Sequence, residues 1–289
     1  MNDAFNFTEL MVPLWLMYPH ISRYSIGWRM GYGESYAMKF YDWFNGLSEK
    51  EQQQFQKMFP EPRSWQGWYE DEYSAHEDIY IKSSDDEETK YYLDLCKSYQ
   101  QGKKIEFLFF WGHQPAKDGR ITKACLSQWW ESDFVVDIDK YCCMEQYMMA
   151  EKARLFQDDA VLADIMASKQ PKQIKDLGRK VRNFNAESWN LRRYEIVRAG
   201  NYAKFAQNIQ LRNFLIETKE RVLVEASPYD KIWGIGMSAD ADNIENPLSW
   251  KGLNLLGFAL MDVRDELISV YQNYDKVNWN KIRKEFNEI

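Results

Sequence analysis

Histidine and cysteine are scarce in this sequence. The three histidines, His20, His76 and His113, show no HExxH spacing, and a GxSxG elbow is also missing. Histidine-based triads and zinc hydrolysis are therefore not expected. The four cysteines show no CxxC spacing and no adjacent histidine cluster, so they predict free, mostly buried thiols and no metal site.

Long apolar runs are missing as well. No stretch approaches the roughly 18 consecutive apolar residues of a membrane span, and the N-terminus lacks a basic segment followed by an apolar run and a cleavage site. The 289 residues, 45% of them hydrophobic, predict a globular protein with one large core or two smaller ones. We expect a cytoplasmic protein without membrane partners.

The charge is unevenly distributed. Residues 1–104 hold 11 Lys and Arg against 17 Asp and Glu, whereas residues 105–289 hold 26 against 27. A basic cluster in the second part is either a solvated helix face or a modest site for anionic ligands. Its members are Lys169, Lys172, Lys175, Arg179, Lys180, Arg182, Arg192, Arg193 and Arg198.

Residues 1–104 are rich in aromatic side chains and predict a mainly helical region. Apolar residues at helical spacing in 34–47, followed by Ser48 and Glu51 as a capping box, predict a helical hairpin. The acidic stretch 83–89 predicts a surface loop or a domain boundary before a helix near 88–100.

The pattern changes at Ile105. Strand-like runs occur at 105–113, 134–141 and 221–227, and the remaining segments are mostly helical. We therefore expect an α+β fold, rich in helices and with a small β-sheet. The predicted helices span 141–156, 159–167, a segment beginning at Pro171, 186–208 and 251–271, and the predicted domains are 1–104, 105–271 and a C-terminal tail helix in 272–289.

Glu145 is an unexpected carboxylate on an otherwise apolar helix. Its helical neighbours include Tyr141, Met148 and Met149, and Lys152 lies two turns further on the same face. A charge in such surroundings costs several kcal/mol unless it is paired or takes up a proton. Glu145 and Lys152 therefore form either a structural ion pair or a functional site, in which Lys152 is a nucleophilic amine or a phosphate anchor.

Two further segments combine polar and aromatic residues. In 177–190, Arg179 and Arg182 are spaced to face one way on a helix, and Trp189 is either a core residue or a ring on which a base stacks. In the long loop before the last strong helix, Gly234 and Gly236 would let the backbone approach a ligand. The segment 251–254 would place unpaired N–H groups at the N-terminus of that helix, where an anion is favoured. A Rossmann site is rejected, because the third glycine and the strand-turn-helix context are missing.

The same segments resemble the NADAR family, which includes the bacterial YbiA-type N-glycosidases. The resemblance covers about 165 residues, taken in order, and leaves residues 1 to about 100 outside. It is carried by "LSQWW" (126–130), "EQYMMAEKARLF" (145–156), "LGRKVRNF" (177–184), the Trp189 helix, "AKFAQN" (203–208), "VLVEASPYDKIWGIG" (222–236) and "WKGLNLLGFALMDVRDEL" (250–267).

This resemblance implies a helix-rich α+β domain that hydrolyses an N-glycosidic bond. It implies that Glu145 is the essential acid, that Trp189 and Trp233 are pocket aromatics, and that Lys152, Arg179 and Asn254 hold the substrate. Together with the residue patterns above, we predict Glu145 and Lys152 as catalytic residues and expect no cofactor or metal. The predicted substrate-binding residues are Gln128, Trp129, Arg179, Trp189, Trp233, Gly234, Gly236, Lys251 and Asn254. Many relatives have Asn in the segment matching "LSQWW", whereas this chain has Gln128.

Two classes of function stay open at this point. In the first, Glu145 helps to cleave a phosphorylated riboside or an ADP-ribosyl base, such as a riboflavin-pathway intermediate or ADP-ribosyl-guanine carried by nucleic acid. In the second, the chain is a non-catalytic reader of ADP-ribose or a nucleotide, and its aromatic N-terminal region binds a partner. The choice of substrate and the oligomeric state are not determined by the sequence.

Overall fold

The computed structural model describes residues 10–70 and 85–286, with the backbone alone for 85–89. The chain forms two compact units. The first consists of Met1–Ile79, Val135–Asp139 and Glu266–Ile289, and the second of Tyr80–Phe134 and Lys140–Asp265. The division of function at residues 104 and 271 stays a prediction, and structurally the helix before residue 104 belongs to the second unit.

The first unit is helical and aromatic. Ser48 and Glu51 form the predicted capping box at the start of the second of two consecutive helices. The helices contact each other as the predicted hairpin requires, since the Phe40 and Phe44 ring centroids lie 6.0 and 5.6 Å from that of Phe55. The Trp15 ring centroid lies 5.3 Å from those of Trp65 and Trp68. The α-helices of this unit are α1 (Leu14–Met17), α2 (Tyr32–Asn45), α3 (Glu49–Met58) and α11 (Trp279–Glu285).

Two distant segments complete the first unit. The Asp137 carboxylate accepts hydrogen bonds from the Ser22 N–H and O–H at 3.0 and 2.7 Å. Further along the chain, the Asn273 side-chain amide donates to the Met58 carbonyl at 2.8 Å. Residues far apart in the sequence therefore hold one aromatic core together, and the predicted tail helix, α11, belongs to it.

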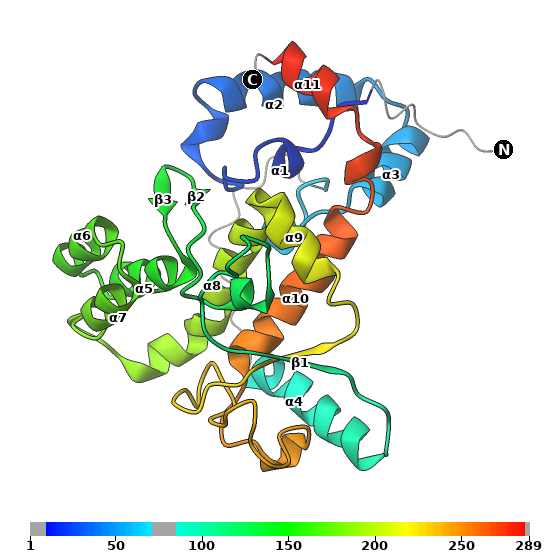
Figure 1. Cartoon of the computed structure of the whole chain (residues 1–289). Coiled ribbons are helices and arrows are strands. Elements are labelled where there is room, and N and C mark those ends of the chain that lie inside the picture. Colours follow the sequence, from blue (N-terminus) through cyan, green and yellow to red (C-terminus); the bar gives the residue numbers. More distant parts are fainter. Residues whose placement is uncertain (1–9, 71–84, 287–289) are drawn as a thin grey trace. The chain divides into compact units, whose positions relative to one another are not determined.

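The second unit contains most of the helices (Figure 1). The predicted helices are confirmed, with α10 beginning at Leu255 and not at Lys251. The predicted loop at 83–89 is wrong for residues 85–89, which begin α4, and residues 83–84 lie outside the described residues. The helices of this unit are α4 (Asp85–Gln100), α5 (Met144–Leu155), α6 (Asp159–Ala167), α7 (Pro171–Gly178), α8 (Ala186–Gln207), α9 (Ile209–Ile216) and α10 (Leu255–Val270), whose last turn enters the first unit.

The strands form two small sheets. β1 (Phe107–Phe110) and β4 (Val222–Glu225) pair in parallel, with Phe110 opposite Glu225. The run 134–141 is not one strand, because the chain reverses at Asp137 (φ 56°) to give β2 (Phe134–Val136) and β3 (Asp139–Tyr141). The helix-rich α+β class is confirmed.

Helix α5 is the centre of the second unit. Eight of its twelve residues are buried, and it packs against α6, α7 and α8. Glycines allow this close packing: a Cβ at Gly178 would lie 2.0 Å from Met149 Sδ, and one at Gly200 would lie 2.4 Å from the Tyr147 ring. A carboxylate on α5 is therefore surrounded by helices on several sides.

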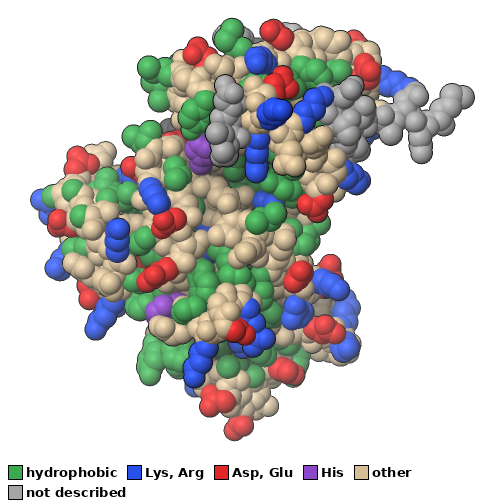
Figure 2. Space-filling view, turned by 45° about the horizontal axis from the view of Figure 1, so that its top comes forward, with side chains coloured by type: hydrophobic (Ala, Val, Ile, Leu, Met, Phe, Trp, Pro, Cys, Tyr) green, Lys and Arg blue, Asp and Glu red, His purple; other side chains and the backbone are tan. Residues whose placement is uncertain are grey.

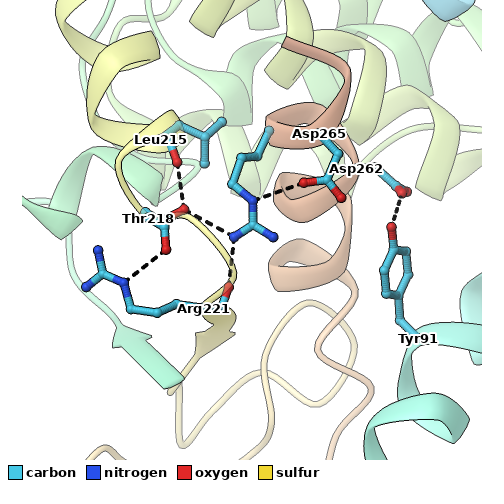
Figure 3. Close-up of polar contacts among 7 residues, drawn as sticks. Tyr91, Leu215, Thr218, Arg221, Asp262 and Asp265 are labelled. Carbon is cyan, nitrogen blue, oxygen red and sulfur yellow. Dashed lines mark hydrogen bonds and ion pairs between the residues drawn. The ribbon is translucent and has the colours of Figure 1, made fainter. Parts of the chain in front are cut away.

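Polar contacts hold the chain that leads into β4 (Figure 3). Arg264 on α10 is 3% exposed, and it donates to the Arg221 carbonyl at 2.8 Å and to the Thr218 hydroxyl at 3.2 Å. Two residues before Arg264, Asp262 accepts hydrogen bonds from the Tyr91 and Tyr194 hydroxyls at 2.5 and 2.6 Å. These contacts fix β4, α4 and α8 to α10.

No helix among residues 10–70 and 85–286 is both long enough and apolar enough to cross a bilayer.

Candidate functional site

The candidate site lies where the carboxyl ends of β1 and β4 meet the first turn of α5. Parallel strands place the residues that follow them at one edge, which is where α/β proteins commonly bind ligands. After β1 the chain reaches His113, whose ring centroid lies 5.4 Å from that of Trp129. Trp129 in turn contacts Glu145, so the strand edge and the helix end share one set of side chains.

Glu145 is buried, with 3% of its surface exposed. Its N–H donates to the Gln128 carbonyl at 2.9 Å, and its Oε2 accepts from Trp129 Nε1–H at 3.1 Å. Its second oxygen, Oε1, is buried without a hydrogen-bond partner. Burial raises the pKa of Glu145 to about 7. The positive charge of Lys175 and the hydrogen bond from Trp129 lower this pKa and so offset part of the effect of burial. Near neutral pH this group can both accept and release a proton.

Gln128 and Trp129 follow a short 3-10 turn, Lys123–Leu126, and the buried Lys204 holds that turn in place. Lys204 Nζ donates to the Cys125 carbonyl at 2.6 Å and to the Ser127 carbonyl at 3.3 Å. Burial lowers the pKa of Lys204 to about 8. No sequence pattern predicts this positioning role, because Lys204 is distant from the turn along the chain.

Gln128 leaves a second unused acceptor in the site. Its side-chain nitrogen lies 3.5 Å from Met148 Sδ, and its Oε1 is buried without a partner. The Trp129 ring is also approached by Lys175 Nζ, 5.9 Å from the ring centroid. Buried acceptors normally have donors. The Oε1 atoms of Gln128 and Glu145 are therefore available to accept hydrogen bonds from N–H or O–H groups.

Lys152 does not form the expected ion pair with Glu145. Its ammonium donates to the Gly178 carbonyl at 2.8 Å and lies 4.4 Å from the centroid of the Phe184 ring and 5.8 Å from that of Trp189. Burial lowers the pKa of Lys152, although the charge of Glu145 acts in the opposite direction. Lys152 and Trp189 thus lie together in an aromatic corner of the site, whereas a direct Glu145–Lys152 contact is not among the ion pairs of the described residues.

Arg179 and Arg182 do not share a helical face. Helix α7 ends at Gly178, and Arg182 binds the buried Asp158 through its backbone N–H at 2.8 Å and its Nε at 3.1 Å. These hydrogen bonds lower the pKa of Asp158. Arg179 is largely exposed and pairs with Asp176 at 3.0 Å. Arg182 is therefore structural, while Arg179 stays a predicted binder at the edge of the site.

Members of the basic cluster accordingly lie in different surroundings. Arg198 is buried and pairs with Glu195 at 3.0 Å, as Arg182 does with Asp158. On the face drawn in Figure 2, acidic and basic side chains of the described residues are intermixed. Lys175, beside Trp129 and Glu145, is the member that the structure brings to the site.

The glycines of the long loop have structural tasks. A Cβ at Gly234 would lie 2.8 Å from the Glu225 carbonyl, so glycine lets the loop fold back onto the end of β4. Gly236 has φ +66°, a conformation that L side chains rarely adopt. Trp233 is half-buried, and its N–H donates to Asp230 Oδ1 at 2.8 Å. Direct ligand contacts at Gly234, Gly236 and Trp233 stay predictions.

Asn254 holds the strand and does not face a substrate. It is fully buried, its Oδ1 accepts from the Glu225 N–H at 3.0 Å, and its amide donates to the Leu223 carbonyl at 2.9 Å. The expectation that Asn254 is a substrate-holding group is therefore corrected, because its amide is hydrogen-bonded to the backbone of β4.

The predicted anion site at the start of α10 is also wrong. The N–H groups of Leu253, Leu255 and Leu256 already donate to loop carbonyls at 3.0–3.2 Å. No free N–H group of these three residues remains for an anion. Lys251 is exposed beside this segment, so its side chain alone remains as a predicted phosphate contact.

Sequence reasoning missed a second acid, Glu225, which is half-buried. This residue ends β4, and its Oε2 is buried without a hydrogen-bond partner. Burial raises the pKa of Glu225 to about 8; the negative charges of Asp230 and Glu145 raise it further, and the positive charge of Lys175 lowers it. A carboxylate closing an apolar strand run was the available signal. No group of three or more His, Cys, Asp or Glu side chains in the described residues is placed to hold a metal ion.

Known proteins resemble this chain over the region that contains the site. The model of the NADAR domain matches residues 109–268. N-glycosidase R617 of Acanthamoeba polyphaga mimivirus is 44% identical over 168 residues, which cover 56% of this chain and 96% of that protein. N-glycosidase Npun_R5314 of Nostoc punctiforme is 32% identical over 127 residues, 44% of this chain and 74% of that protein.

A solved structure is also similar. The NMR structure of the E. coli protein YbiA matches with a TM-score of 0.46 and 24% identity, over 57% of this chain and 86% of that one. The family model alone covers more than half of the sequence and includes Gln128, Glu145, Lys152 and Glu225. The chain belongs to the NADAR family.

Proposed function

We propose that this NADAR protein hydrolyses the N-glycosidic bond between a ribose and a base, in a ribosylated or ADP-ribosylated substrate. N-glycosidase activity in general is supported by the relatives that carry this name. The observation that carries the proposal is Glu145: a buried carboxyl, fixed by Trp129 on one oxygen and unpartnered on the other.

The geometry of Glu145 suits the chemistry of this bond. Cleavage of a ribosyl C–N bond develops positive charge at C1′, and a nearby carboxylate stabilises that charge. Trp129 Nε1–H fixes Oε2, so Oε1 is left to accept a proton from the attacking water. Because burial places the pKa of Glu145 at about 7, the group is a stronger base than an exposed carboxylate and is substantially ionised at neutral pH.

The surrounding side chains suit a substrate with a base and a phosphate. Trp129 offers an aromatic ring beside Glu145, and Lys175 brings a positive charge next to that ring. In the aromatic corner of the site, the Lys152 ammonium lies near the rings of Phe184 and Trp189. We assign Lys152 as an anchor for phosphate or for ribose hydroxyls, because its ammonium is hydrogen-bonded to the Gly178 carbonyl and so is not presented as a free amine.

The sharpest test is a pair of substrates incubated side by side. One is an oligonucleotide carrying ADP-ribosylated guanine, and the other is a ribosylaminopyrimidine phosphate; the released base is measured for each. We expect hydrolysis of one or both by the intact chain. Tight binding of ADP-ribose by calorimetry, without product from either substrate, would instead identify a non-catalytic reader.

The matched variants are Glu145→Gln and Glu220→Gln. Glu145→Gln keeps the shape of the side chain but removes the base, so kcat should fall by about 10²–10⁴ while ligand affinity is retained. Glu220 is exposed, two residues before β4, and its replacement should leave kcat unchanged. Unchanged turnover in Glu145→Gln contradicts the assignment of Glu145.

A further inference from the structure

The backbone of Glu225 is held by hydrogen bonds, whereas one oxygen of its carboxyl has no hydrogen-bond partner. Its N–H donates to Asn254 Oδ1 at 3.0 Å, and its carbonyl accepts from the Ile235 N–H at 3.0 Å. Parallel pairing with β1 sets it opposite Phe110, at the carboxyl edge of the strands. Backbone contacts on both sides therefore fix the Cα of a residue whose carboxyl Oε2 is buried without a partner.

A purely structural role does not account for this carboxyl. Structural acids in this protein are hydrogen-bonded, as the buried Asp158 is by Arg182 at 2.8 and 3.1 Å and the half-buried Asp262 is by two tyrosines. An unpartnered polar oxygen costs stability, and an apolar side chain of similar size would avoid that cost. Glu225 shares its unpartnered state with Glu145 and Gln128, the two other residues of the site with unpartnered buried oxygens.

The two acids lie in one electrostatic environment. Burial raises the pKa of both Glu145 and Glu225, because it disfavours the ionised form of each carboxyl. The negative charge of Asp230 raises both pKa values further, and the positive charge of Lys175 lowers both. The negative charge of Glu145 also raises the pKa of Glu225, and the positive charge of Arg179 lowers the pKa of Glu145. Ionisation of one carboxyl therefore disfavours ionisation of the other, so that a state with one carboxylate and one carboxylic acid is favoured.

We propose that Glu225 is the general acid of this site, which protonates the departing base while Glu145 acts on water. This inference rests on the proposed function, since it assigns a second catalytic group to the same reaction. It follows the general logic of paired carboxyls, in which different environments separate an acid from a base.

The proton and electron balance of the step is closed. The C1′–N bond breaks, its electron pair stays on the base nitrogen, and the Glu225 carboxyl proton is transferred to the base. The water oxygen bonds to C1′, and the proton it loses is taken by the Glu145 carboxylate. The products are the free sugar and the protonated base; the reaction leaves Glu225 ionised and Glu145 neutral, and proton exchange with water restores both.

The test compares leaving groups that differ in their need for a proton. A ribosylaminopyrimidine phosphate releases a base that must be protonated, whereas 4-nitrophenyl riboside 5-phosphate releases a stable phenolate. We expect Glu225→Gln to lower kcat/KM by about 10²–10⁴ for the first and by less than about tenfold for the second. Glu145→Gln should slow both substrates, and Glu220→Gln should slow neither.

The outcomes separate the two proposals. Equal losses on both substrates, or no loss on either, in Glu225→Gln overturn the general-acid role, while a loss in Glu145→Gln alone leaves the proposed function standing. Failure of Glu145→Gln to slow either substrate overturns the proposed function itself. Thermal unfolding of each variant shows that it is folded.

The unmodified protein supplies a second, independent measurement. With the base-releasing substrate, kcat/KM should fall above a pH of about 8, as Glu225 loses its proton. With the phenolate-releasing substrate this alkaline limb should be missing. An identical alkaline limb for both substrates overturns the assignment, even if Glu225→Gln does not fold.

Discussion

The two compact units bury different kinds of side chain. In the first, aromatic rings pack against one another around Trp15, with centroids 5.3–5.4 Å apart. In the second, charged and polar side chains are buried; apart from Asn273, every buried polar residue among the described parts of the chain lies there. Burial of an aromatic ring stabilises the folded state, whereas burial of a charge destabilises it unless the charge is paired.

This contrast separates scaffold from chemistry. Several buried polar groups in the second unit serve as structural pairs, including Arg264 with the Arg221 carbonyl and Lys204 with the Cys125 carbonyl. A smaller set, Gln128, Glu145 and Glu225, keeps an unpartnered oxygen at the site. Substitution of a core ring should therefore destabilise the first unit, whereas substitution of an unpartnered site carboxyl can stabilise the second unit while removing activity.

The largest effect on stability is expected for Trp15→Ala. Trp15 is 2% exposed, and truncation of a buried Trp costs about 3–5 kcal/mol. Calorimetric unfolding should show the transition of the first unit at lower temperature, with hydrolysis by the second unit retained below that transition. Trp15→Phe is the control, because it keeps a ring in the cluster and removes the unpartnered indole N–H. Equal destabilisation by both variants would show that ring packing is not the source of the stability that Trp15 contributes.

The next effect is expected for Glu145→Gln, with the opposite sign. The pKa of Glu145 is raised from 4.5 to about 7, so as pH rises from 4.5 to 7 the unfolded chain ionises while the native site stays protonated. Native stability therefore falls over this window, by about 3 kcal/mol, and the loss is complete above pH 7. Glutamine does not titrate, so the variant should gain stability relative to the unmodified chain between pH 4 and pH 8.

Urea unfolding at pH 4, 6 and 8 measures this change. The difference in unfolding free energy between Glu145→Gln and the unmodified chain should grow with pH. The same series with Glu220→Gln should give a constant difference, because that carboxyl is exposed. A pH-independent difference for Glu145→Gln would mean that the carboxyl is not desolvated in the native state.

The smallest effect on stability is expected for Arg179→Ala. The Arg179–Asp176 pair is exposed, and such pairs contribute about 0–1 kcal/mol. If Arg179 holds a substrate phosphate, KM should rise several-fold with little change in kcat. Asp176→Ala removes the partner alone and is the matched control. A KM unchanged in Arg179→Ala removes this residue from the binding groups.

Local sequence patterns were sufficient for the helices and for Glu145. Apolar spacing, the Ser48–Glu51 capping box and Pro171 at a helix start each act within a few residues, and all appear in the structure. The carboxylate of Glu145 could be identified because its helical neighbours are apolar. The errors occurred where the nearest partner in space is far along the chain. Asn254 and the start of α10 were predicted to face a ligand, but β4 and the preceding loop use those groups.

The sequence by itself determined the family, the helices and the acid on α5, because short-range spacing and ordered motifs carry that information. Only the tertiary structure decided the parallel pairing of β1 with β4, which brings Glu225 into the site. The physical reason is that desolvation and hydrogen-bond satisfaction depend on every chain segment around a group. The same carboxyl type is structural at Asp158 and unpartnered at Glu225, and only the packed neighbours distinguish the two.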